Sequence, residues 1–116
     1  MNTVKIKRIY EEPNKNDGYR MLVDRLWPRG LTKEKAALSE WNKEIAPSPE
    51  LRIWFGHDIK KFKRFTLLYE AELKSKKEDL RRIKSIAKTQ NLTLLYAAKD
   101  EKINHAAILL NVLKNF

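Results

Sequence analysis

The stretch from Leu92 to Ala98 constrains the fold more than any other part of the chain. Its side chains are apolar at every position except Thr93, so it lacks the alternation of a strand that faces water on one side. A short, continuously apolar run is typical of a strand buried on both faces of a parallel sheet. Parallel strands need crossover connections, which are usually helices. The run therefore predicts an α/β protein in which this strand is central.

The rest of the chain supplies further strands and the crossover helices. Residues 4–9 alternate apolar and basic side chains with a period of two, which is typical of a strand with one buried face. Further strands are expected over 19–23 and, from a mixed pattern, over 38–45. Capping residues and apolar side chains at three- and four-residue spacing predict helices over 33–37, 49–55, 59–73, 78–88 and 104–114.

Neither a repeat nor a linker interrupts this order, and 116 residues suffice for one domain. We therefore expect residues 1–116 to form a single small α/β domain. Its centre is expected to be a mainly parallel sheet of about four strands flanked by helices.

Composition excludes several classes of protein. The absence of cysteine excludes disulfides, thiolate metal sites and a cysteine nucleophile. Phosphate-loop, dinucleotide-binding, hydrolase-elbow and zinc-protease motifs are also missing from the sequence, so we expect neither a metal nor another cofactor. Uninterrupted apolar runs are at most five residues long, and the chain starts without an apolar signal core. These features predict a cytoplasmic protein with no membrane partner.

The net charge of +10 is unevenly distributed. Residues 59–90 hold 11 basic and 4 acidic side chains, and this segment is expected to be helical. Two interpretations are open. The basic side chains form a solvated helical face, or they form a surface that binds nucleic acid through its phosphates.

Candidate functional residues follow the expected strands at their carboxyl ends, where open parallel sheets bind ligands. The loops after the second and last strands carry charged residues, and the helix that starts after Ser48 adds others. The expected ligand-binding residues are Arg25, Trp27, Arg29, Arg52, Trp54 and Lys99, and the expected catalytic residues are His105, His57 and Asp24. Arginine presents paired planar donors to phosphate or carboxylate, so the sequence predicts a pocket for a small anion.

Structural roles compete with these functional ones. Asp24 and Arg25 can form a loop ion pair or a backbone clamp, and tryptophans usually pack in small cores. His57 precedes a capping aspartate and can hydrogen-bond across the turn. His105 is the stronger candidate for proton transfer, since a structural need for imidazole at a helix start is less evident.

Four motifs occur in order along the chain: Asp17-Gly18-Tyr19-Arg20, Val23-Asp24-Arg25-Leu26-Trp27-Pro28-Arg29-Gly30, Trp54-Phe55-Gly56-His57-Asp58 and Asn104-His105-Ala106. Together they resemble the short YeaO-like branch of the family called domain of unknown function 488, and the resemblance covers nearly the whole chain. The resemblance implies a small bacterial-type α/β protein and signature residues that include Arg25, Trp27, Arg29, Arg52, Trp54, His57, Lys99 and His105. It implies no particular reaction. Longer relatives carry a cysteine near the end of the last strand, where this chain has Tyr96-Ala97-Ala98.

Three functions are compatible with these observations. The first is a pocket for a phosphate- or carboxylate-bearing ligand, with or without hydrolase or transferase activity, so whether the protein is an enzyme stays open. The second is a nucleic-acid accessory protein that uses residues 59–90. The third is a protein-interaction module without chemistry. The sequence leaves the oligomeric state open.

Overall fold

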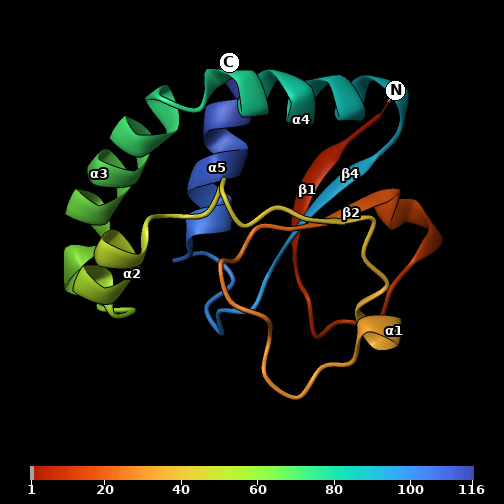
Figure 1. Cartoon of the computed structure of the whole chain (residues 1–116), viewed down its shortest axis with the longest axis horizontal. Helices are drawn as coiled ribbons and strands as arrows, with labels where there is room; N and C mark the ends of the chain where they lie inside the picture. Colours follow the sequence, from red (N-terminus) through yellow and green to blue (C-terminus); the bar gives the residue numbers. More distant parts are fainter. Residues whose placement is uncertain (1) are drawn as a thin grey trace.

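A four-stranded sheet forms the centre of the protein in the computed structural model, which describes residues 2–116 (Figure 1). The strands are β1 (Val4–Arg8), β2 (Tyr19–Leu22), β3 (Glu40–Trp41) and β4 (Leu92–Tyr96). Their order across the sheet is β1-β4-β2-β3, and every pair of neighbours is parallel. The expected α/β class is confirmed, and so is the central place of the apolar strand.

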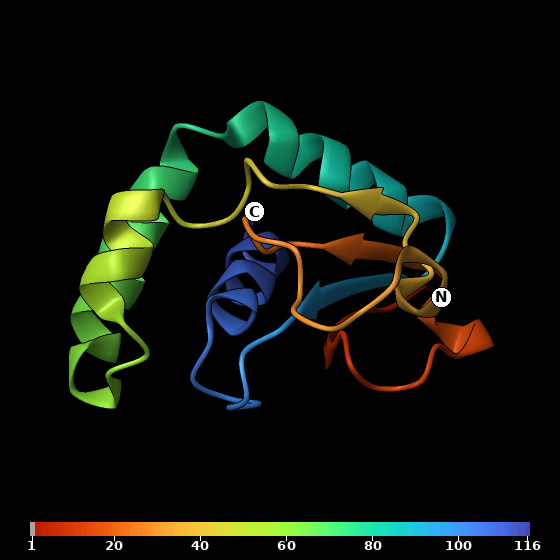
Figure 2. The same ribbon diagram turned by 60° about the horizontal axis from the view of Figure 1, so that its bottom comes forward.

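The helices lie mainly over one face of the sheet. They are α1 (Lys33–Ala36), α2 (Pro49–Phe55), α3 (Phe62–Lys74), α4 (Lys77–Thr89) and α5 (His105–Lys114), with 3₁₀ turns η1 (Lys15–Asp17) and η2 (Ile59–Lys61). Figure 1 shows α2 to α5 gathered at the left and top of the view, while α1 lies apart from them at the lower right. In Figure 2 the long helices α3 and α4 run along the left and the top of the view.

Each face of the sheet has its own core. The main core joins Met21 and Leu94 of the sheet to Tyr69, Ile83 and Leu109 of the helices. The second core lies on the opposite face, where Leu22 and Leu95 meet Ala36 of α1 and Trp27 and Trp41. Burial on both faces explains why β4 has no polar stripe.

The five predicted helices are present, and α3 buries the apolar face that its sequence indicates. The expected stripe on α3 is present, because Phe65, Tyr69 and Leu73 are buried and Phe62 is half-buried. Asp58 caps the short η2 turn, and α3 follows directly from that turn. No helix among residues 2–116 combines the length and apolar character that crossing a membrane requires.

The third strand is much shorter than the expected 38–45. Only Glu40 and Trp41 pair with β2, and the chain then turns away. The Asn42 side chain accepts a hydrogen bond from the Ile45 amide at 3.2 Å, and the buried Tyr69 hydroxyl donates to the Ile45 carbonyl at 2.7 Å. These side chains satisfy backbone groups that a longer strand would pair, so tertiary contacts override the local β preference.

Candidate functional site

The carboxyl ends of β2 and β4 are joined by Asp24. Its Oδ2 accepts a hydrogen bond from the Ala97 amide at 3.0 Å, just beyond the end of β4. Its Oδ1 is buried and lies 3.0 Å from Nε2 of His105, the first residue of α5. The loops that follow both strands leave the sheet at this edge (Figure 1). Asp24 and His105, which are far apart in sequence, therefore form one polar pair at the edge where the sequence predicts a site.

The neighbours of His105 fix the position of its proton. Nε2 faces two acceptors, the Asp24 carboxylate at 3.0 Å and the Val23 carbonyl at 2.9 Å, so Nε2 must carry hydrogen. In the neutral ring Nδ1 is then an acceptor, and in the protonated ring Nδ1 is a second donor. The preceding Asn104 caps α5 by accepting from the Ala107 amide at 2.9 Å, which holds the imidazole in place.

Arg25 acts as a backbone clamp. Its Nε and Nη2 each donate at 3.2 Å, to the Pro47 and Ala46 carbonyls respectively, in the segment that leads into α2. Its Nη1 lies 3.8 Å from the exposed Glu44 carboxylate. Asp24 thus pairs with His105, while Arg25 fixes the loop before α2. The guanidinium has one nitrogen that is not committed to the backbone.

The tryptophans differ in environment. Trp27 packs edge-on against Trp41, with 5.3 Å between ring centroids, and its Nε1 donates to the Leu31 carbonyl at 2.7 Å. Packing in the second core accounts for it. Trp54 is 40% exposed on α2, and the Lys61 ammonium lies 5.1 Å from its ring centroid.

The remaining candidates lie at the surface. Arg29, Arg52 and Lys99 are exposed, and their side chains make no hydrogen bond or ion pair within residues 2–116. His57 is also exposed and adopts a left-handed backbone conformation with φ of 58° in the turn after α2. Among the described residues, no group of three or more metal-ligating side chains comes together.

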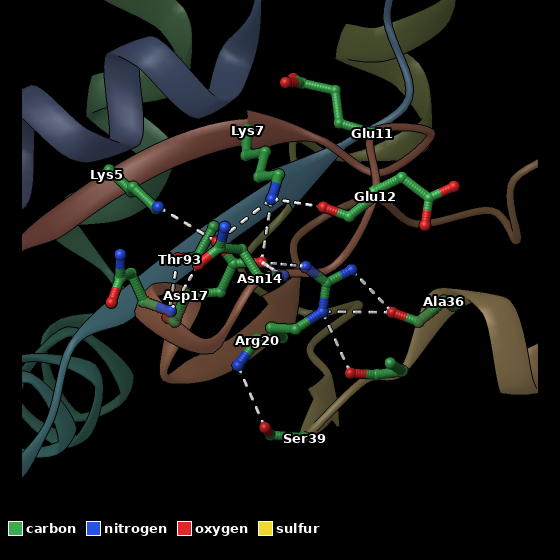
Figure 3. Close-up of polar contacts among 12 residues, drawn as sticks. Lys5, Lys7, Glu11, Glu12, Asn14, Asp17, Arg20, Ala36, Ser39 and Thr93 are labelled. Carbon is green, nitrogen blue, oxygen red and sulfur yellow. Dashed lines mark hydrogen bonds and ion pairs between the residues drawn. The ribbon is translucent and has the colours of Figure 1, made fainter.

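A second polar cluster, centred on Asp17, was not predicted from the sequence (Figure 3). Asp17 is fully buried, and its carboxylate oxygens lie 3.0 Å from Lys5 Nζ, 3.0 Å from Lys7 Nζ and 2.6 Å from Arg20 Nη1. Arg20 also donates to the Ala36 and Ala37 carbonyls, which ties α1 to the cluster.

Sheet register explains why these residues meet. Lys5, Thr93 and Arg20 occupy matching positions on β1, β4 and β2, so they form one row across the sheet. Thr93 donates its hydroxyl to the Asp17 carbonyl at 2.8 Å. The available sequence signals were the alternating lysines of β1 and an aspartate three residues before an arginine, but neither reveals which strands are neighbours.

The electrostatics of Asp17 follow from this geometry. Burial alone raises the pKa of a carboxyl group, but hydrogen bonds from Lys7, the Asn14 amide, Lys5 and Arg20 outweigh that effect and hold the pKa of Asp17 well below its usual range. The carboxylate is therefore ionised at all physiological pH values and neutralises only part of the charge around it.

The basic side chains of 59–90 mostly remain at the surface of α3 and α4. Arg82 is exposed but paired, because it binds Glu40 through two hydrogen bonds at 2.9 and 2.6 Å. Lys76 is half-buried and donates to the Glu44 carbonyl. The exposed basic residues whose side chains make no hydrogen bond or ion pair within residues 2–116 are Lys60, Lys63, Arg64, Lys74, Lys77, Arg81 and Lys88.

Comparisons with known proteins agree on one family. A family model described as the inactive DUF488-N3 subclade matches residues 3–116. The uncharacterized protein YeaO of Escherichia coli is 46% identical over 97% of each chain. The uncharacterized protein Rv3073c of Mycobacterium tuberculosis is 34% identical over 95% of this chain and 92% of its own. No solved structure matches the chain significantly.

Proposed function

Because the chain belongs to the DUF488-N3i family, the inactive DUF488-N3 subclade, we propose that it binds a small phosphate- or carboxylate-bearing ligand without transforming it. The binding site is the carboxyl edge of the sheet, the usual ligand-binding edge of open parallel sheets. The observation that carries the proposal is the Asp24–His105 pair, which holds an imidazole at that edge with Nε2 turned inward. Nδ1 is then the ring atom left for a ligand.

Charge at this edge favours an anion. When His105 is protonated, Nδ1 becomes a donor, and Asp24 stabilises the imidazolium from the opposite side. Lys99 follows β4 and Arg29 lies in the loop after β2, and both side chains are exposed. An anion bound at the edge would receive one hydrogen bond from the ring and screened attraction from these cations.

Binding without turnover is favoured over hydrolase or transferase activity by two observations. The chain contains no cysteine, and Asp24 is held at Oδ2 by the Ala97 amide while its buried Oδ1, which has no hydrogen-bond partner within residues 2–116, lies 3.0 Å from His105 Nε2. Asp24 is therefore placed to orient the imidazole rather than to attack a substrate. The description of the subclade as inactive points the same way.

A ligand panel tests the proposal. Thermal unfolding would be followed with nucleotides, sugar phosphates and organic acids at constant ionic strength. We expect at least one class to raise the midpoint, because a ligand that binds only the folded state stabilises it by mass action. The shift is expected to disappear in His105→Gln, to shrink in Lys99→Gln, and to persist in the control Lys33→Gln, an exposed lysine on α1. No stabilisation by any anion would refute the proposal.

Nucleic-acid binding is a second candidate, favoured by the seven exposed basic residues named above, which lie on η2, α3 and α4. Oligonucleotide titrations at two salt concentrations would test it. Affinity that falls steeply with salt and is reduced by Lys63→Gln and Arg64→Gln would support a phosphate-binding surface. Affinity that is negligible at low salt would exclude it.

A further inference from the structure

A hollow of about 340 Å³ lies beside the Asp17 cluster, away from the carboxyl-edge site. Its walls come from β1 and from the loop that leads into β2. The lining residues are Lys5, Ile6, Lys7, Glu11, Asn14 and Asn16. Two of them, Lys5 and Lys7, are cations that already contact the buried carboxylate (Figure 3).

The two lysines differ in how much hydrogen-bonding capacity they have left. Lys7 Nζ donates to both oxygens of Asp17 and to the Glu12 carbonyl at 2.7 Å, and its side chain is 13% exposed. Within residues 2–116, the one polar contact of Lys5 Nζ is with Asp17 Oδ1 at 3.0 Å, and the Lys5 side chain is 42% exposed. An ammonium group has three donors, so Lys5 keeps donors that can be directed to a ligand in the hollow.

Neutral donors complete the wall. The Asn14 side-chain oxygen accepts from the Asn16 amide at 2.8 Å, which orients the Asn14 carboxamide and leaves its NH₂ group for another acceptor. Asn16 also lines the hollow, and its side chain makes no hydrogen bond within residues 2–116. The one lining carboxylate, Glu11, turns an oxygen back to the Arg8 amide at 3.1 Å.

The charge balance favours an anion here. Three cations, Lys5, Lys7 and Arg20, surround the single buried carboxylate of Asp17. The cluster therefore carries two positive charges in excess, which Glu11 at the wall reduces to one. Burial of Lys7 and Arg20 reduces the screening of that excess by solvent.

We propose that this hollow is an anion-binding site separate from the carboxyl edge, and that it takes a phosphate group, with Lys5, Asn14 and Asn16 donating to its oxygens. The phosphate can be free or can belong to a small phosphate monoester, since the hollow is larger than one phosphate group. Lys7 and Asp17 position Lys5 and do not need to move when the ligand binds.

Amide chemical shifts of the ¹⁵N-labelled full chain would test the proposal. The protein would be titrated with inorganic phosphate and with ribose 5-phosphate, and sodium chloride titration to the same ionic strength would be the reference. We expect saturable shifts at residues 5–7 and 14–16 with at least one phosphate probe. Tighter binding of the monoester would show that the hollow also recognises the organic part of the ligand, and equal binding would show that it recognises the phosphate group alone. Shifts that never saturate, or that chloride reproduces, would overturn the proposal.

Matched variants separate this site from general charge effects. Lys5→Gln should weaken phosphate binding at least tenfold, and Asn16→Ala several-fold. Lys5→Gln is expected to stay folded because Asp17 keeps Lys7 and Arg20. The control is Lys15→Gln, an exposed lysine of the same loop that does not line the hollow.

The position of the shifts distinguishes this proposal from the carboxyl-edge site. Shifts confined to Asp24, Lys99 and His105 would support the edge site and refute the hollow. An affinity that Lys5→Gln leaves unchanged, or that Lys15→Gln reduces equally, would also overturn the proposal.

Discussion

Replacing Asp17 with asparagine tests whether the buried charge cluster organises the sheet. The substitution keeps the shape of the side chain and removes its charge, so Lys7 and Arg20 lose an ionic partner while their side chains are 13% and 6% exposed. Breaking a buried pair by removing one partner costs about 3–5 kcal/mol. The lower end of this range applies here, because Lys5 can turn its ammonium group to water and Arg20 keeps its hydrogen bond to the Ala36 carbonyl.

We therefore expect Asp17→Asn to lower the free energy of unfolding by about 3 kcal/mol. Urea denaturation followed by circular dichroism would measure this loss. With a slope of about 1.5 kcal/mol/M, typical of a small domain, the midpoint should fall by roughly 2 M. The matched control is Asp58→Asn, an exposed N-cap at which asparagine caps as well as aspartate, and it should change stability by no more than about 0.5 kcal/mol.

The pH dependence of this loss gives an independent check. Because the folded-state pKa of Asp17 is lowered, its ionised form contributes stability that is fully present above the unfolded-state pKa of about 4. That contribution is lost as the pH falls from there toward the folded-state pKa. The difference between the wild type and Asp17→Asn should therefore be constant from about pH 6 to 7 and narrow below about pH 4. A loss no larger than that of Asp58→Asn, or a difference that does not change in acid, would refute the reasoning.

Two further substitutions test the packing around the sheet by urea denaturation. Gly18→Ala should lower the free energy of unfolding much more than Gly30→Ala, although φ is positive at both positions. An added Cβ at Gly18 would lie 2.2 Å from the Asn91 carbonyl oxygen, whereas an added Cβ at Gly30 would meet no atom within 4 Å. Equal losses of stability in the two variants would contradict this reasoning. Tyr69→Phe should cost about 1–3 kcal/mol, because it leaves the Ile45 carbonyl without its hydroxyl donor, and a neutral effect would show that water replaces that donor.

Local pattern was sufficient for the elements that the cores define. β4 was predictable because burial on both faces leaves an apolar run, and α3 because its buried stripe repeats at helical spacing. β3 was overestimated because two side chains satisfy the backbone around Ile45 in place of strand pairing. Asn42 does so from within the expected strand, whereas Tyr69 of α3 is distant in sequence and could not be anticipated from the local pattern.

The proximity of Asp24 and His105 was predictable from the sequence, but the partners of Arg25 were not. Asp24 and His105 both follow carboxyl ends of parallel strands, so their proximity follows from topology alone. For Asp24 and Arg25 the sequence left open a loop ion pair, a backbone clamp or a ligand role. Arg25 forms the clamp, but its partners, the Ala46 and Pro47 carbonyls, are brought within reach only by the course of the chain before α2.

Asp17 and Asp24, which flank β2, differ in the side chains that surround their carboxylates, and the sheet accounts for the difference. Asp17 precedes β2 and Asp24 follows it, and each is tied to β4, through the Thr93 hydroxyl and the Ala97 amide respectively. At the first position the register adds side chains from β1, the other neighbour of β4, and these are lysines. At the second position the partner comes from α5 and is a histidine. The sheet register thus surrounds Asp17 with three basic side chains, whereas the start of α5 places a single imidazole beside Asp24.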